Sequence, residues 1–324
     1  MISRENLLIA REALQKRYYR EGGIEQMLDD AKITYVMNDP CGITIQPGFP
    51  AARMKFKIRM DFFTHICSFE DIQVIQEFTG SIIHSLDNLL EAAEKMIVEA
   101  KKQGATVIKN GQAYFRDLRF NSRTQHEAAQ CLNKILSEDR YAAWDRYIRY
   151  SPDEMRCLSD FMVHYFCMLA LKHNMTVAFH TGPVYHFTAG PRNLLELSNL
   201  FTLYPDVHFN LMHGNMPYYH DAAYIASRMH NVSIDLCWCH NLSTTYSLEA
   251  LYFWLGLAPI NRIIGYGTDS MQIENIWWCS QLARKTTYQA LARHIDEGRF
   301  TEEDAVRIAT MILFENPARI FKFK

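Results

Sequence analysis

Residues 176–182 of the chain read Thr-Val-Ala-Phe-His-Thr-Gly, a short apolar run that ends in a histidine directly before a turn. Three later segments have the same form, an apolar run followed by a polar residue and a turn: HFNLMHG at 208–214, VSIDLCW at 232–238 and IIGYGTDS at 263–270. Short apolar runs bounded by turns are typical of the buried strands of a parallel sheet. The repetition therefore predicts successive strands that end in polar side chains.

The polar residues that end these runs are His180, His213, Cys237 and Asp269, and the intervals between their numbers are 33, 24 and 32 residues. Intervals of this size accommodate a strand and a returning helix. A parallel barrel brings the carboxyl ends of its strands to one face, and that face carries the chemistry. We therefore expect His180, His213 and Asp269 to converge. Imidazole and carboxylate together suit Zn²⁺ or another first-row divalent metal such as Mn²⁺.

The rest of the chain alternates in the same way. Apolar patterns predict strands at Lys32–Met37, Lys55–Phe63 and Ala105–Lys109, and helical periodicity predicts helices near residues 5–30 (broken at Gly22-Gly23), 85–102, 124–150, 152–173, 191–203, 219–229, 246–256, 272–296 and from Thr301 onward. Alternating strands and helices imply a parallel sheet with right-handed crossovers. The seven predicted strands are one fewer than a TIM-type (β/α)8 barrel needs, and a seven-stranded open sheet is the alternative. We expect a single domain over residues 1–324, in which 1–30 is an N-terminal helical segment.

Composition excludes several classes of protein. The formal net charge is −2, the sequence pI is about 6.7, and no basic stripe is visible, which argues against a nucleic-acid partner. No apolar run approaches the roughly 20 residues of a membrane helix, and the N-terminus lacks the apolar region of a signal peptide. The eight cysteines are irregularly spaced, which indicates reduced thiols. We expect a cytoplasmic protein that binds a small-molecule substrate, as a monomer or a homo-oligomer.

Further candidates for substrate contacts follow the predicted strand at 105–109. Lys109 has three possible roles: a lysine exposed to solvent, a contact for a substrate anion, or a carbamylated bridge between metals. Tyr114, Arg116 and Arg119 lie on a predicted loop. An arginine there could hold a carboxylate in a bidentate pair, although loop arginines are usually solvated.

Trp238 and His240 are the last candidates, and they follow the apolar run that begins at Val232. They could line a substrate pocket. The alternative is that Trp238 only packs at the rim of a barrel.

Several motifs occur in an order that is characteristic of one family. They are FHTG (179–182), YPDV (204–207) leading to LMHGNMPY (211–218), HNVSID (230–235), GTD (267–269) and ILFENPA (312–318). In this order they resemble the amidohydrolase superfamily, above all its amidohydrolase 2 branch, which is related to uronate isomerases and to amidohydrolases associated with glutamine synthetase-like proteins. The resemblance runs from about Lys32 to the C-terminus. It implies a (β/α)8 barrel with a mononuclear or binuclear divalent metal centre.

The resemblance also implies roles for single residues. His180 matches the metal-binding histidine after strand five, and His213 matches the histidine after strand six, a second metal ligand or an acid/base group. Asp269 matches the aspartate after strand eight, which binds metal and acts as general base toward metal-bound water. Lys109 lies near the position of a carbamylated lysine on strand four of binuclear members.

One motif of the family is missing. Members begin with His-x-His on strand one, and this sequence contains no His-x-His. The resemblance therefore implies that the chain starts after this strand or has lost part of the metal centre. A barrel without one strand has two unpaired edges. We expect either a gap between the strands at Lys32–Met37 and Ile263–Asp269 or an N-terminal segment that fills it.

Three functions are compatible with these features. The first is a metal-dependent hydrolase of a small C–N or ester substrate, in which metal-bound hydroxide attacks a carbonyl, Asp269 is the general base and His213 stabilises or protonates the developing charge. The second is a uronate isomerase-like or decarboxylase-like enzyme on a small carboxylate gripped by Arg116 or Arg119. The third is a truncated or non-catalytic barrel with an incomplete metal site. Product analysis separates the first two, and metal content separates the third.

Overall fold

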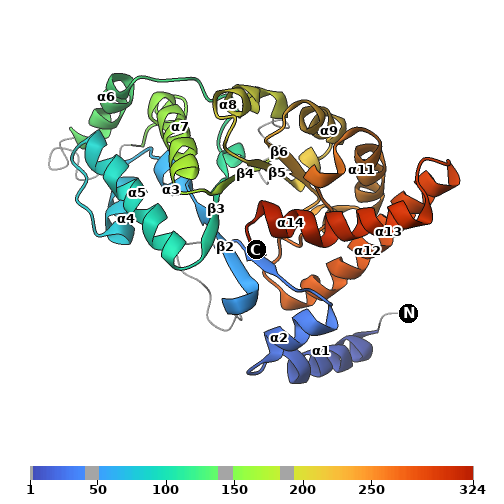
Figure 1. Ribbon diagram of the computed structural model, residues 1–324. Coiled ribbons are helices and arrows are strands. Elements are labelled where there is room, and N and C mark those ends of the chain that lie inside the picture. Colours follow the sequence, from blue (N-terminus) through green and yellow to red (C-terminus); the bar gives the residue numbers. More distant parts are fainter. Residues whose placement is uncertain (1–2, 41–50, 138–148, 183–192, 324) are drawn as a thin grey trace. The chain divides into compact units, whose positions relative to one another are not determined.

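The computed structural model describes residues 3–40, 51–137, 149–182 and 193–323. The chain falls into two compact units. Unit 1 consists of Met1–Pro40, Thr44–Phe56 and Asp235–Lys324, and unit 2 consists of Cys41–Ile43 and Lys57–Ile234. The elements are labelled in Figure 1. The single domain expected over residues 1–324 stays a prediction.

Unit 2 is built on parallel strands that are almost entirely buried. They are β3 (Ala105–Asn110), β4 (Thr176–His180), β5 (Phe209–Met212) and β6 (Val232–Asp235), whose last residue belongs to unit 1. Strand β4 pairs with β3 and with β5, and β5 pairs with β6. All these strands lie close to their predicted positions, because a strand covered on both faces reads as a continuous apolar run.

Helices alternate with these strands. The helices of unit 2 are α3 (Asp61–Thr64), α4 (Phe69–Thr79), α5 (Leu86–Lys102), α6 (Gln125–Leu136), α7 (Arg156–Lys172), α8 (Ser198–Leu203) and α9 (Tyr219–Arg228). Helix α4 lies beside α5, and α6 lies beside α7 (Figure 1). Helix α4 was not predicted, although Ser68 and Asp71 form a capping box at its start. The predicted helices at 124–150 and 191–203 fall partly outside the described residues, at 138–148 and 191–192.

The strand predicted at Lys55–Phe63 is too long. Strand β2 spans Met54–Arg59 and runs from unit 1 into unit 2, after which the chain turns into α3. Two hydrogen bonds of Asp61 explain the turn: its carboxylate accepts from Gly111 N at 2.7 Å, and its backbone oxygen accepts from His65 N at 2.9 Å. The prediction that the strand continues through Phe63 is wrong, because adjacent phenylalanines suggested a strand where the backbone already bends.

Unit 1 contains the remaining strands. Strand β1 (Val36–Asn38) pairs in parallel with β2, with Val36 beside Met54, and β7 spans Ile263–Ile264. Both strands are shorter than predicted. Lys32 adopts a left-handed φ of 52° at the end of α2, and Gly265 N turns to donate to Ile312 O at 2.9 Å. Among the described residues of this unit, no ladder joins β1 to β7.

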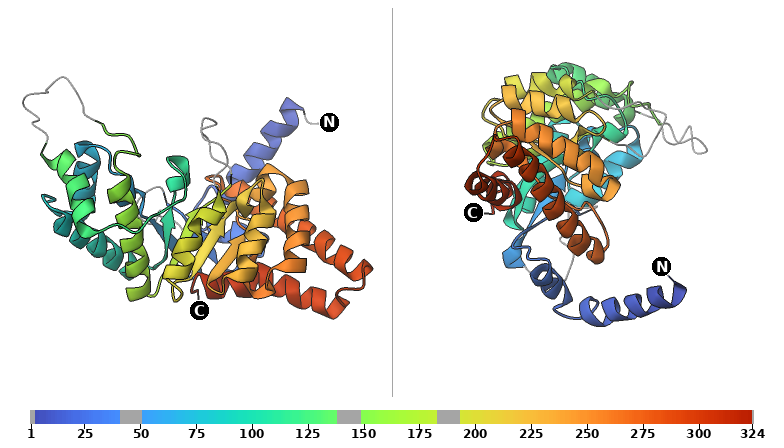
Figure 2. Two further views of the ribbon diagram at one scale, coloured as in Figure 1. Left: turned by 90° about the horizontal axis from the view of Figure 1, so that it is seen from above. Right: turned by 90° about the vertical axis from the view of Figure 1, so that its right-hand side faces the viewer.

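The helices of unit 1 are α1 (Arg4–Tyr18), α2 (Gly23–Asp30), α10 (Cys239–Leu242), α11 (Thr244–Leu257), α12 (Ile273–Asp296), α13 (Glu302–Thr310) and α14 (Asn316–Ile320). The predicted break at Gly22-Gly23 is confirmed, with a left-handed φ of 70° at Gly22. The helix predicted from Thr301 onward begins with a capping box formed by Thr301 and Asp304. Helix α1 buries none of its residues, and Figure 2 shows it extending away from the rest of unit 1.

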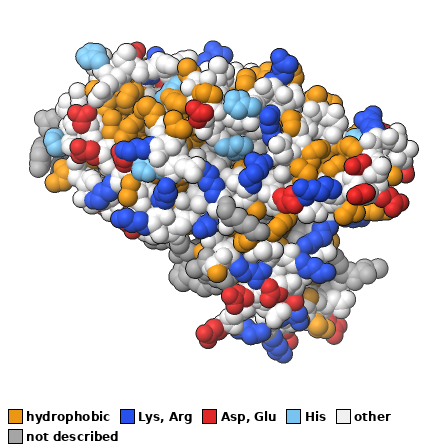
Figure 3. All heavy atoms as spheres, viewed as in Figure 1, with side chains coloured by type: hydrophobic (Ala, Val, Ile, Leu, Met, Phe, Trp, Pro, Cys, Tyr) orange, Lys and Arg blue, Asp and Glu red, His pale blue; other side chains and the backbone are white. Residues whose placement is uncertain are grey.

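The surface carries mixed charge. On the face drawn in Figure 3, lysine and arginine side chains are interspersed with aspartate and glutamate. Within the described parts of the chain, no helix combines the length and apolar character that crossing a membrane requires.

Candidate functional site

Two of the predicted site residues, His180 and His213, lie side by side in unit 2. His180 is the last residue of β4 and pairs in register with Met212, so that His213 follows directly at the end of β5. Both side chains are fully buried, and their ring centroids are 4.4 Å apart at an interplanar angle of 57°. The spacing of the two histidines in the sequence is therefore that of neighbouring strand ends.

The backbone after these strands is tightly turned. His213 and Gly214 adopt left-handed φ values of 68° and 61°, which redirect the chain after β5. Gly182 follows β4 with φ +78°, and a Cβ at this position would lie 2.8 Å from Met216 N. The hydroxyl of Thr181 donates to Met212 O. These contacts fix the two loops against each other and hold the imidazoles in place.

Tyr114 is the third member of this group. It ends a 3-10 turn, Gln112–Tyr114, that follows β3. Its hydroxyl lies 3.1 Å from His180 Nδ1, and the two ring centroids are 4.3 Å apart. A hydrogen bond at one imidazole nitrogen orients the ring and presents the other nitrogen to a metal or a substrate. Tyr114 therefore positions Nε2 of His180.

A pocket of about 250 Å³ opens beside Tyr114. Its lining consists of Arg59, Asp61, Phe62, Tyr114 and Phe115. Arg59 was not among the predicted site residues. The signal that could have found it is its place as the last residue of β2, since carboxyl ends of parallel strands bear functional residues.

Buried lysines lie on two strands of unit 2. Lys109 in β3 is 1% exposed, which rules out the solvent lysine considered from the sequence. Lys57 in β2 is 5% exposed, and its Nζ donates to Met212 Sδ at 3.4 Å. Met212 directly precedes His213 in the chain. The roles of Lys109 as an anion contact or a carbamylated bridge stay predictions.

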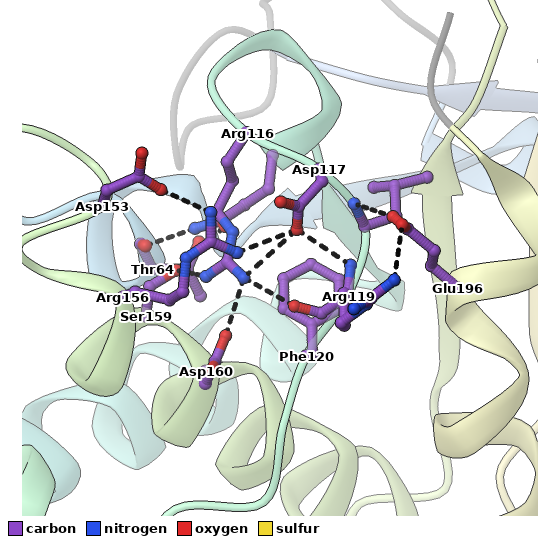
Figure 4. Close-up of polar contacts among 12 residues, drawn as sticks. Thr64, Arg116, Asp117, Arg119, Phe120, Asp153, Arg156, Ser159, Asp160 and Glu196 are labelled. Carbon is purple, nitrogen blue, oxygen red and sulfur yellow. Dashed lines mark hydrogen bonds and ion pairs between the residues drawn. The ribbon is translucent and has the colours of Figure 1, made fainter.

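Arg116 belongs to a network of buried polar groups (Figure 4). Its guanidinium lies 2.8 Å from Asp160 Oδ1, donates to Ser159 Oγ at 3.1 Å, and stacks 4.9 Å from the Phe120 ring centroid. Ser159 Oγ in turn donates to Gln112 Oε1 at 2.9 Å. The network thereby anchors the 3-10 turn that carries Tyr114. These contacts support positioning by Arg116 more than the expected grip on a substrate, which stays a prediction.

Arg119 lies on the outside of the same loop. Its side chain is 65% exposed and lies 3.3 Å from Glu196 in an ion pair. It does not line the pocket beside Tyr114, and its predicted contact with a substrate stays a prediction.

The other predicted residues belong to unit 1. Asp269 is exposed and has a left-handed φ of 48°. Trp238 N donates to Gly267 O at 2.9 Å, and a Cβ at Gly267 would lie 2.8 Å from Cys237 Sγ, so glycine permits this close approach. His240 is buried with Nε2 2.9 Å from Thr286 Oγ1, and burial lowers its pKa to about 4. A neutral, buried His240 fits packing. The convergence of Asp269 with the two histidines of unit 2 stays a prediction.

The donor set fits a metal in kind but falls short in number. His180 and His213 offer imidazole nitrogens, which zinc prefers, and catalytic zinc sites use three protein ligands. Within residues 3–40, 51–137, 149–182 and 193–323, no group of three or more His, Cys, Asp or Glu side chains is placed to hold a metal ion. A third ligand has to be supplied before a metal can be held.

The family of the chain follows from its sequence. The model of the amidohydrolase 2 family, described as amidohydrolase, matches residues 141–323, which is more than half of the chain. The chain belongs to this family. The family is generally metal-dependent, and its description as amidohydrolase indicates enzymatic activity of the hydrolase type.

One curated relative is the protein fluG of Emericella nidulans, which is 28% identical over 131 residues. The match covers 40% of this chain and 15% of fluG, so the chain spans only a small part of that relative's length.

Solved structures show the fold. The uronate isomerase of Thermotoga maritima superposes with a TM-score of 0.75 at 14% identity, over 92% of this chain and 69% of that one. A candidate metal-dependent hydrolase of Lactobacillus casei superposes with a TM-score of 0.70 at 18% identity, over 93% and 76% of the two chains. The fold is thus the TIM-type α/β barrel of the amidohydrolases, as the sequence predicted.

Proposed function

We propose that the protein is a metal-dependent hydrolase of a small C–N or ester substrate. The observation that carries this proposal is the buried pair of His180 and His213 at adjacent strand ends, with Tyr114 oriented toward His180 Nδ1. Membership of the amidohydrolase family supports the reaction class. The kind of substrate and the hydrolytic reaction are both part of this proposal.

The proposed metal ligands are His180, His213 and Asp269, and the proposed metal is Zn²⁺, with Mn²⁺ as the alternative. Two histidines and one carboxylate make up the three protein ligands of some catalytic zinc sites. A divalent metal supplies such enzymes with a water activated for attack on a carbonyl. Tyr114 holds the His180 ring, and Asp269 accepts a proton from water. In the alternative role, in which His213 is not a ligand, it donates a proton or a hydrogen bond where negative charge develops.

Other parts of this proposal concern the protein's setting. We place the protein in the cytoplasm, because all seven cysteines in the described residues are free thiols. We also propose that the protein acts on a small-molecule substrate, that it has no nucleic-acid or membrane partner, and that it works as a monomer or a homo-oligomer.

Metal content tests the proposal. His180→Ala and Asp269→Asn should each lower the zinc bound per chain and abolish turnover, while His126→Ala should not, because His126 is an exposed histidine on α6. Circular dichroism checks that each variant is folded. Unchanged zinc in both site variants would exclude the two residues as ligands.

A second candidate is an isomerase or lyase that acts on a small carboxylate. The observation that favours it is Arg59 in the wall of the pocket beside Tyr114, since a guanidinium recognises carboxylates. Product masses distinguish the two candidates: the products of a hydrolase together weigh one water more than the substrate, the products of a lyase together weigh the same as the substrate, and an isomerase yields a single rearranged acid of the same mass.

A further inference from the structure

The pocket beside Tyr114 combines one cation with aromatic walls. Arg59 supplies the positive charge, Asp61 a negative one, and Phe62, Tyr114 and Phe115 the rings. Its volume of about 250 Å³ suits a small molecule, since pockets for drug-sized ligands measure about 300–1,000 Å³. Tyr114 also contacts His180. A ligand in this pocket would therefore lie next to the proposed reaction site.

Arg59 is placed to meet such a ligand. It ends β2, and 24% of its side chain is exposed. Asp61 Oδ2 lies 3.8 Å from Arg59 Nη1, and Asp61 Oδ1 accepts from Gly111 N at 2.7 Å. A guanidinium has five N–H donors in a planar fork, and the two oxygens of a carboxylate fit this fork in a bidentate pair.

Asp61 is fixed by the neighbouring loop. A Cβ at Gly111 would lie 2.9 Å from Asp61 Oδ2, so the loop approaches this closely only with glycine. Because Gly111 N donates to one oxygen of Asp61 at 2.7 Å, the carboxylate is held in place. Asp61 therefore orients the guanidinium by charge from one side.

The aromatic walls are held by their own neighbours. Phe115 stacks on His65 with ring centroids 3.9 Å apart and an interplanar angle of 16°. Phe62 packs against Phe78 with centroids 5.1 Å apart. Phe115 is nevertheless 43% exposed. Ordered rings that stay accessible offer apolar surface to the body of a ligand, at little cost in conformational entropy.

We propose that this pocket selects substrates that carry a carboxylate on a compact body with a flat or apolar face. The carboxylate binds Arg59 in a bidentate pair, and the body lies against Phe62 and Phe115. Arg59 is then the residue that determines specificity. The inference rests on the proposed function, because the pocket serves the same site through Tyr114.

Binding of benzoate and its uncharged counterpart benzamide tests this inference on the full chain by NMR titration. Arg59→Gln should raise the Kd for benzoate at least tenfold, a change of about 1.4 kcal/mol, and Arg59→Lys by a smaller factor because the fork is lost. Arg293→Gln should leave the Kd unchanged, since Arg293 is an exposed arginine on α12 paired with Glu249 at 2.9 Å. Benzamide should bind weakly to all variants, and Phe115→Ala should weaken both ligands.

Equal benzoate affinity in the wild type and both Arg59 variants, or no binding by the folded wild type, overturns the inference. Zinc content measured on the same samples separates it from the proposed function. A chain that takes up zinc but shows no Arg59-dependent binding rejects the pocket alone. A chain that binds benzoate through Arg59 but takes up no zinc rejects the metal-dependent hydrolase alone.

Discussion

Replacing Asp160 with asparagine tests whether the Arg116 network is structural. Asp160 is fully buried, and its carboxylate lies 2.8 Å from Arg116 Nη2 and 3.0 Å from Arg123 Nε. The substitution keeps the shape of the side chain but leaves Arg116, whose side chain is 2% exposed, with only Asp117 as a compensating charge, a 41% exposed carboxylate 3.7 Å away. Breaking a buried pair in this way costs about 3–5 kcal/mol. We expect the lower end, because Arg123 is 23% exposed and can turn to solvent.

Urea unfolding followed by circular dichroism measures this loss. With an m value of about 3 kcal/mol/M, a loss of about 3 kcal/mol lowers the midpoint by about 1 M. Arg119→Gln is the matched control, since its pair with Glu196 is 65% exposed on the arginine side and such pairs contribute at most about 1 kcal/mol. A midpoint for Asp160→Asn within about 0.2 M of the wild type would refute the structural role, and Arg116 would return as a candidate for binding substrate.

Three further predictions concern backbone and buried groups. Gly182→Ala should lower the free energy of unfolding by at least about 1 kcal/mol more than Gly298→Ala, because both glycines have positive φ but only Gly182 has a neighbour, Met216 N, in the way of a Cβ; denaturant midpoints compare them. Burial lowers the pKa of His240 to about 4, so this histidine binds a proton more readily in the unfolded chain than in the folded one. Its contribution to the free energy of unfolding is therefore complete above about pH 6.5 and is lost as the pH falls toward 4. His240→Gln should flatten that fall, and an unchanged pH profile would contradict it. Thr301→Ala removes a capping box and should lower the free energy of unfolding by about 1 kcal/mol. Thermal unfolding measures this loss, and an unchanged unfolding temperature would show that the cap of α13 does not stabilise the protein.

The buried strands of unit 2 could be predicted because their environment imposes a simple pattern. Strands β4 and β5 are covered on both faces, so most of their side chains are apolar, with Thr176 and Asn210 as buried polar exceptions, and a histidine stands at the end of β4 and directly after β5. The boundaries of β2 and β7 could not be predicted in this way. Asp61 ends the run after β2 through a contact with Gly111, 50 residues later in the chain. Such long-range hydrogen bonds leave no local pattern in the sequence.

The candidate site could likewise be predicted only in part from the sequence. His180 and His213 could be predicted as neighbours, because parallel strands in sequence order place their ends together. Tyr114 and Arg116 are two residues apart on one loop, yet one contacts His180 and the other turns into the network around Asp160. No periodicity governs a 3-10 turn of this length, so the sequence could not tell them apart. Arg59 was missed because a strand extended through Phe63 would bury it in mid-strand, whereas a strand that ends at Arg59 places it among the functional residues. The arginine to substitute first in the search for a substrate carboxylate is therefore Arg59, since it alone of these arginines lines the pocket that Tyr114 joins to His180.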